Sequence, residues 1–140
     1  MQLSQIIRTW RVFAGQMVLE LFGGLFIDTA YVGQTSTIVY SAAPVPNAAL
    51  ANNFVVTITD NVAFIVGAPL NPPPAGFAQT IWITFRNTSG GAHGAGTWNA
   101  IYKVSGNLAA IATANNRTIA FTWNGTNWIE TFRSAADVAN

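Results

Sequence analysis

The residues that could do chemistry are few in this sequence. It contains a single histidine, His93, no cysteine, and five carboxylates: Glu20, Asp28, Asp60, Glu130 and Asp137. The carboxylates are scattered, and Glu130 is the leading candidate for the acid or base of a two-carboxylate hydrolase. A lone histidine in a glycine-rich loop is more often a solvated side chain than a catalyst. We therefore predict that the protein is not an enzyme.

The motifs give no support to a metal or phosphate site. No cluster of Cys, His and Asp has metal-ligand spacing, so we predict no metal and no cofactor. The glycine-rich stretches at 89–91 and 94–96 match phosphate-cradling loops in composition only, because the helix and lysine context is missing. The Asn-x-Ser/Thr patterns at Asn87, Asn116 and Asn124 are assigned to turn chemistry rather than to glycosylation.

The five tryptophans are the other candidates for a site. Exposed aromatic rings bind sugars or bases, whereas buried rings fill a sandwich core. Trp82 is out of phase with Ile81 and Ile83, which predicts that it lies on the opposite face of its strand. For Trp98, beside the glycine-rich loop, an exposed position is left open. For the tryptophans as a group, core or subunit contacts are favoured over ligand binding.

Composition indicates one domain and a tendency to assemble. The 140 residues suffice for one domain with a real core. Of these residues 51% are hydrophobic and 8% are charged, against roughly 25% charged in an average soluble protein. We expect copies of the chain or other subunits to cover much of this surface; the alternative is a neutral Thr/Asn/Ser/Gly surface. A net charge of +1 argues against nucleic acid as a partner.

The first 50 residues are predicted to form an N-terminal arm and connector, partly strand or helix. The apolar stretch 12–32 is long enough to span a bilayer, but Glu20 and Asp28 disfavour a transmembrane helix by roughly 2.5–3.5 kcal/mol each. We therefore expect no membrane partner. The arm either folds onto its own domain or docks on a neighbouring subunit by strand addition. In the second case, the predicted contact residues are Arg8, Trp10, Arg11 and Phe13.

Residues 51–140 are predicted to form an all-β sandwich, with jelly-roll or immunoglobulin-like strand order left open. The clearest element is a hairpin over 117–133, with its turn at 124–127. Alternation places Trp128, Glu130 and Phe132 on one face after the turn, and a short loop brings Trp123 close to Trp128. Strands at 54–59 and 62–66 are predicted to pair as a second hairpin. Two further strands are predicted at 80–86 and 97–104. Residues 134–140 are predicted to form a loose polar tail.

The order of several segments resembles a module of virion structural proteins in tailed bacteriophages. The segments are FVVTIT at 54–59, IWITFRNTSGG at 81–91, TWNAIYK at 97–103, RTIAF at 117–121 and NGTNWIE at 124–130. The resemblance covers roughly residues 53–140. It implies a non-enzymatic, β-rich virion component, commonly trimeric, of the kind found in capsid decoration proteins, head fibres and tail fibres.

Within that group, the size of the chain favours a capsid decoration (cement) protein. Long fibres add repeats or heptads, and the sequence has neither. The expected protein is a homotrimer on the capsid surface of the virion, bound to the major capsid protein and stabilising its shell. The alternative is a fibre or tail adhesin domain that binds host surface glycans through Trp82 or Trp98.

Overall fold

The computed structural model describes residues 7–13, 16–21, 34–91 and 96–140, so His93 lies outside the described residues. The chain divides into two compact units, Met1–Val32 and Gly33–Asn140. This division falls earlier than the predicted boundary at residue 50, because β3 (Thr35–Ile38) already pairs within the sheet of the second unit.

The first unit contains an antiparallel pair of strands, β1 (Ile7–Phe13) and β2 (Gln16–Leu21). The arm is therefore strand where it is described, a choice that the sequence left open. Aromatic and β-branched residues in β1 suit a pleated strand.

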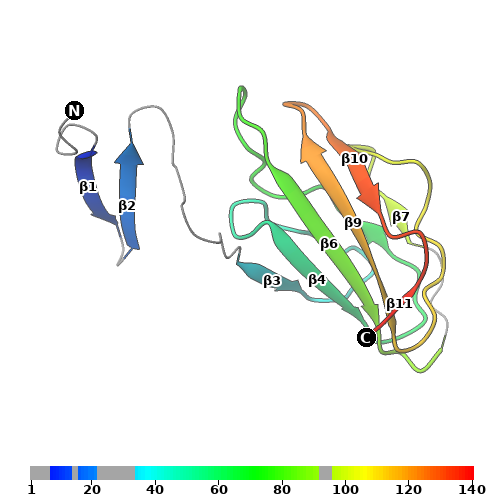
Figure 1. Cartoon of the computed structure of the whole chain (residues 1–140). Helices are drawn as coiled ribbons and strands as arrows, with labels where there is room; N and C mark the ends of the chain where they lie inside the picture. The colour runs from blue at the N-terminus through cyan, green and yellow to red at the C-terminus, as the bar shows by residue number, and fades with distance from the viewer. Residues whose placement is uncertain (1–6, 14–15, 22–33, 92–95) are drawn as a thin grey trace. The chain divides into compact units, whose positions relative to one another are not determined.

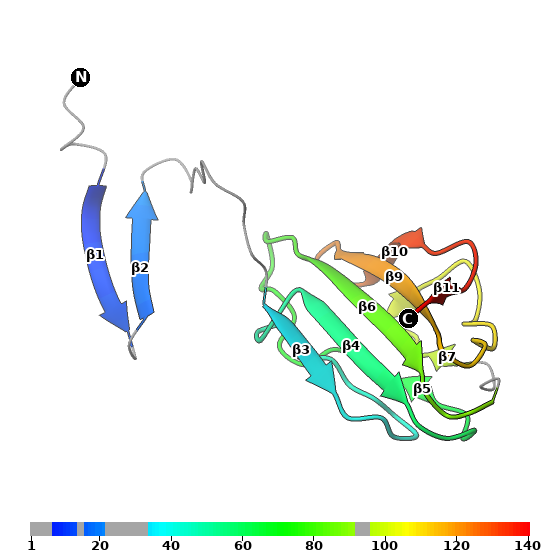
Figure 2. The ribbon, with the colours of Figure 1, turned by 60° about the horizontal axis from the view of Figure 1, so that its bottom comes forward.

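The second unit is built around a mixed sheet in the order β3-β4-β6-β9-β10-β8, with β11 paired to β9 (Figure 1, Figure 2). A small parallel sheet of β5 and β7 accompanies it. The strands after β3 are β4 (Asn53–Ile58), β5 (Ile65–Val66), β6 (Thr80–Asn87), β7 (Thr97–Trp98), β8 (Tyr102–Lys103), β9 (Asn115–Trp123), β10 (Trp128–Arg133) and β11 (Val138–Ala139). The described residues contain no helix, and the prediction of an all-β, sandwich-like fold is confirmed.

The strand order differs from that of an immunoglobulin sandwich, whose sheets are antiparallel. In the large sheet β3 pairs with β4, β4 with β6, and β8 with β10 in parallel. Only β6, β9, β10 and β11 pair antiparallel there.

The core lies against one face of the large sheet and follows from period-two alternation. In β4 and β6 every second residue is buried, including Phe54 and Ile83. The second layer supplies Phe64 and Val66, and β8 at the edge of the large sheet supplies Tyr102; all three side chains are buried. Because β4 and β6 alternate strictly, burial of one row of their side chains leaves the next row on the other face of the sheet.

The hairpin predicted over 117–133 is confirmed as β9 and β10. Trp123 is the register partner of Trp128, and their ring centroids lie 5.2 Å apart. Gly125 takes a φ of 97°, and the side-chain oxygen of Asn124 accepts hydrogen bonds from the backbone N–H groups of Thr126 and Asn127. Asparagine and glycine therefore form the turn for the expected reasons.

Three local predictions were wrong. Residues 54–66 form no hairpin, because β4 already has neighbours on both edges and the chain passes to β5 in the second layer. The strand expected over 97–104 is broken into β7 and β8 by a turn in which Tyr102 N–H donates to the carbonyl of Asn99. The tail is not loose, because β11 pairs with β9 and Asp137 accepts a hydrogen bond from Ala112 N–H.

Candidate functional site

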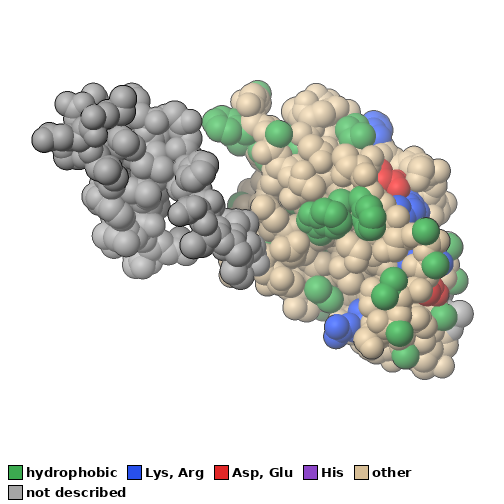
Figure 3. Space-filling view, viewed as in Figure 1, with side chains coloured by type: hydrophobic (Ala, Val, Ile, Leu, Met, Phe, Trp, Pro, Cys, Tyr) green, Lys and Arg blue, Asp and Glu red, His purple; other side chains and the backbone are tan. Residues whose placement is uncertain are grey.

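The strongest candidate surface is the face of the large sheet opposite the core. We call it the open face and define it as the outward residues of β4, β6 and β9, together with Phe132 of β10. Figure 3 shows hydrophobic side chains grouped near the middle of the second unit, with acidic and basic side chains beside the group on the right and mostly neutral surface elsewhere around it. Among the described residues, the charged residue that alternation places on this face is Arg86, near the end of β6.

An exposed aromatic pair occupies the open face. Trp82 is 39% exposed and Phe132 is 46% exposed, with ring centroids 5.5 Å apart. Ala120 of β9 is the register partner of both residues and is buried. Because alanine is small, the two rings meet across β9. The predicted outward position of Trp82 is confirmed.

The position of Phe132 depends on a β-bulge that the sequence did not indicate. Glu130 is the partner of Phe121, whereas Phe132 is the partner of Ala120, so Thr131 is the extra residue. A bulge reverses the faces that follow it. The predicted common face for Trp128, Glu130 and Phe132 is therefore wrong: Trp128 is buried, and Phe132 lies on the open face.

Two pairs of threonine hydroxyls flank Trp82 along the strand direction. Thr80 Oγ1 lies 2.9 Å from Thr122 Oγ1, and Thr84 Oγ1 lies 2.8 Å from Thr118 Oγ1. A hydroxyl has one donor and two acceptor positions, so each pair can also bond an external partner. The open face thus combines an aromatic centre with neutral hydrogen-bonding groups.

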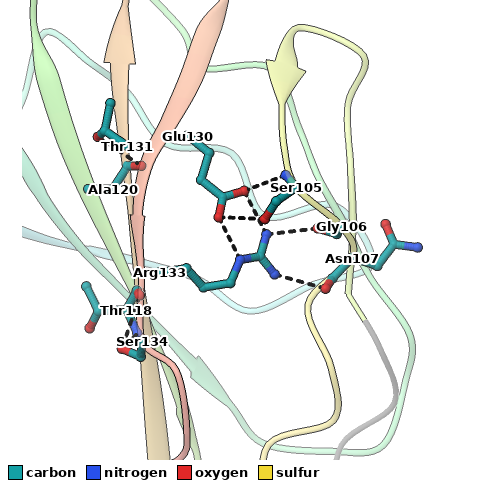
Figure 4. Close-up of polar contacts among 9 residues, drawn as sticks. All are labelled: Ser105, Gly106, Asn107, Thr118, Ala120, Glu130, Thr131, Arg133 and Ser134. Atoms are coloured by element: carbon teal, nitrogen blue, oxygen red, sulfur yellow. Dashed lines mark hydrogen bonds and ion pairs between the residues drawn. The ribbon is translucent and has the colours of Figure 1, made fainter.

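Glu130, the leading catalytic candidate, belongs to a network of hydrogen bonds within the protein, next to the bulge (Figure 4). Its carboxylate accepts hydrogen bonds from Ser105 N–H at 2.8 Å, Ser105 Oγ at 3.0 Å and Arg133 Nε at 2.8 Å. The hydrogen bond from Arg133 lowers the pKa of Glu130, and the bonds from Ser105 lower it further. Arg133 also donates to the carbonyls of Gly106 and Asn107. These contacts give Glu130 a structural role, holding the 105–107 loop against β10.

Contacts within the protein also occupy the side chains of Asn87 and Trp98. Asn87 is buried, and its side chain bonds Ser89, Gly91 and Ile111, in agreement with the assignment of this motif to turn chemistry. Trp98 is partly buried and packs on the core, with its ring centroid 5.0 Å from that of Phe121. Trp98 therefore contributes to core packing, the kind of contact favoured for the tryptophans as a group, because β7 belongs to the second layer that covers the core.

The four arm residues predicted to contact neighbouring subunits all lie in β1. The register pairs Trp10 with Leu19, Arg11 with Val18 and Phe13 with Gln16. Arg11 and Phe13 therefore share one face of the hairpin, and Trp10 is on the other. Arg8 falls at a register irregularity between Ile7 and Thr9.

Within the described ranges, no group of three His, Cys, Asp or Glu residues could hold a metal ion, and no helix is long and apolar enough to cross a membrane. Comparison with known proteins gave no matching family model, no matching curated protein and no matching solved structure.

Proposed function

We propose that the protein is a capsid cement protein of a tailed bacteriophage, which trimerises on the shell of major capsid protein and stabilises it. The open face is the observation that carries this proposal. The segments between residues 53 and 140 that resemble phage virion modules support it, as does a charged fraction of only 8%.

The chemistry of the open face suits a protein partner. Binding energy in protein interfaces concentrates in central aromatic residues surrounded by groups that exclude water. Trp82 and Phe132 supply such a centre, and the flanking threonines supply neutral hydrogen bonds. Because the centre of this contact is uncharged, its affinity for the shell should vary little with salt, which screens exposed charges.

Binding to empty shells tests the proposal. The protein is added to shells that lack it and sedimented with them at about 0.1 M and about 1 M salt. Co-sedimentation at both salt concentrations is expected, together with a loss of roughly tenfold or more in affinity for Trp82→Ala and Phe132→Ala. Phe77→Ala is the control, because Phe77 is 67% exposed but lies outside the open face. Release from the shells at high salt, or equal binding by all three variants, would contradict the proposal.

Glycan binding by a fibre or tail adhesin is the second candidate. The exposed Trp82–Phe132 pair favours it, because aromatic rings stack on sugar rings and threonine hydroxyls can bond sugar hydroxyls. A glycan array probed with the full chain tests this candidate. Binding that Trp82→Ala abolishes, in a protein that does not sediment with shells, would select the adhesin over the cement protein.

A further inference from the structure

The turn of the β9–β10 hairpin holds the only Asn-Gly pair in the sequence, Asn124-Gly125. An asparagine can modify itself when the backbone nitrogen of the next residue attacks the Cγ atom of its side chain. This ring closure needs an unhindered nitrogen, stabilisation of the negative charge that develops on Oδ1, and an amide group that is free to leave. The structure meets each of these conditions at Asn124.

The backbone nitrogen of Gly125 is open to its surroundings. Gly125 is exposed, and a Cβ atom placed there would meet nothing within 4 Å. No described residue accepts a hydrogen bond from its N–H group. Glycine also has no side chain to shield the nitrogen, and it permits the rotations that bring the nitrogen toward Cγ. The nucleophile of the ring closure is therefore accessible.

Two backbone N–H groups already bond Oδ1 of Asn124. Thr126 N–H donates at 3.0 Å and Asn127 N–H at 2.7 Å. Attack at Cγ converts this carbonyl oxygen into an oxyanion, and positioned backbone donors stabilise such a charge more than they stabilise the neutral amide. The turn therefore supplies an oxyanion hole for its own asparagine.

The amide nitrogen of Asn124 is free to leave. Among the described residues, the hydrogen bonds of the Asn124 side chain are the two at Oδ1, so none holds Nδ2. Asn87 shows the opposite case, because its Nδ2 donates to the carbonyls of Gly91 and Ile111, both at 2.6 Å, and the residue is buried. The leaving group is thus fixed at Asn87 and unrestrained at Asn124.

Asn99 is a matched comparison on the surface. It is exposed, and its Oδ1 accepts a hydrogen bond from Ile101 N–H at 3.1 Å, much as Asn124 bonds Thr126. The residue that follows it is Ala100, whose Cβ atom hinders the backbone nitrogen. Asn99 therefore differs from Asn124 chiefly in lacking the glycine.

We propose that Asn124 is a site of self-modification by deamidation in the folded protein. The Gly125 nitrogen, after losing its proton to hydroxide, forms a bond to Cγ of Asn124. The Cγ–Nδ2 bond breaks, and Nδ2 takes up a proton and leaves as ammonia. Water then opens the succinimide ring at either carbonyl and gives aspartate or isoaspartate. The product carries a negative charge in a turn, residues 124–127, that has none in the sequence as synthesised. This inference does not depend on the proposed function.

Peptide mapping of the full chain measures the reaction. The protein is incubated at neutral and at mildly alkaline pH, digested with trypsin and analysed by mass spectrometry, which resolves the exchange of an amide for a carboxyl. Asn124 and Asn99 fall in different tryptic peptides, 118–133 and 87–103. Conversion at Asn124 should be roughly tenfold or more faster than at Asn99. It should rise with pH, because hydroxide removes the proton of the nucleophile.

The same measurement in urea shows what the fold contributes. The two donors to Oδ1 are positioned only in the folded turn, so the folded chain should convert at Asn124 at least as fast as the unfolded chain.

Reciprocal substitutions test the role assigned to the glycine. Ala100→Gly should raise conversion at Asn99 by roughly tenfold or more without touching the β9–β10 hairpin. Gly125→Ala should suppress conversion at Asn124. Because a φ of 97° strains an alanine, the melting temperature of this variant is measured alongside.

Conversion at Asn124 no faster than at Asn99 would overturn the inference. So would a folded chain that converts at Asn124 more than about tenfold slower than the chain in urea, since the fold would then protect the site. An Ala100→Gly chain in which Asn99 stays unchanged would also overturn it.

Discussion

Trp82 of β6 and Phe132 of β10 contact each other across the strand that separates them. Their ring centroids lie 5.5 Å apart, and the intervening residue of β9 is the buried Ala120. The contact exists because Thr131 adds one residue to β10. The same extra residue returns Arg133 to the face of Glu130, so one bulge creates both the exposed aromatic pair and the internal ion pair.

Deleting Thr131 should remove both features at once. Phe132 would change faces, and the Arg133–Glu130 contact, now 2.8 Å, would be lost. The pair is partly exposed and screened by solvent, so the cost is that of lost hydrogen bonds to charged groups, about 1.5–3 kcal/mol. Urea unfolding measures this loss. Thr131→Ala is the control, because it keeps the residue count and should cost less than about 1 kcal/mol.

Stability should fall at acidic pH through Glu130 and Asp137. Arg133 lowers the pKa of Glu130, and the backbone N–H of Ala112, followed by Arg117, lowers the pKa of Asp137. A carboxyl whose folded pKa is depressed stabilises the fold above its unfolded pKa, and that contribution disappears as pH falls through the folded value. The melting temperature should therefore drop as pH falls below about 4.5, the ordinary value for glutamate.

Glu130→Gln isolates one of these two contributions. At pH 7 it should melt below the wild-type protein, because Arg133 loses its charged partner. The difference should shrink as pH falls through the folded pKa of Glu130, since the wild-type carboxyl then becomes neutral too. A difference in melting temperature that stays constant from pH 7 to pH 2 would show that the charge of Glu130 is irrelevant to stability.

Asn87 is expected to be the most sensitive polar position of the second unit. Its amide donates to the carbonyls of Gly91 and Ile111, both at 2.6 Å, and its side-chain oxygen accepts from Ser89 N–H at 2.9 Å. Asn87→Ala removes the side-chain partner of the Ile111 carbonyl, whereas the Gly91 carbonyl keeps hydrogen bonds from Ser89 Oγ and Thr113 Oγ1. One buried unsatisfied group costs about 1–3 kcal/mol, so a loss in that range in unfolding free energy is expected. The exposed Asn107 provides the control, with Asn107→Ala costing less than about 0.5 kcal/mol.

Gly96 marks a close approach between layers. A Cβ atom there would lie 2.6 Å from Cζ of the buried Phe64. Gly96→Ala should therefore destabilise the fold by about 1–3 kcal/mol, the usual cost of overpacking a core. At Gly106 a Cβ would meet nothing within 4 Å, so Gly106→Ala should leave the melting temperature nearly unchanged. Equal effects at the two positions would contradict this account.

Local alternation made much of this fold predictable from the sequence. It located the burial of β4 and β6, the outward position of Trp82 and the hairpin of β9 and β10. It failed where one residue breaks the alternation, so the outward position of Phe132 was missed. It also failed where partners lie far apart in sequence, as in the contact between Asp137 and Ala112 N–H. Neither a bulge nor a distant partner leaves a mark in local periodicity.

The central place of β9 bears on synthesis as well as on stability. This strand lies between β6 and β10 and also pairs with β11, yet it begins only at Asn115. During translation, an incomplete chain would carry β6 with one edge unpaired, and open strand edges invite aggregation. Ribosome-stalled chains that end before residue 115 should stay sensitive to protease, whereas release of the whole chain should give resistance; resistance of the shorter chains would contradict this order of events.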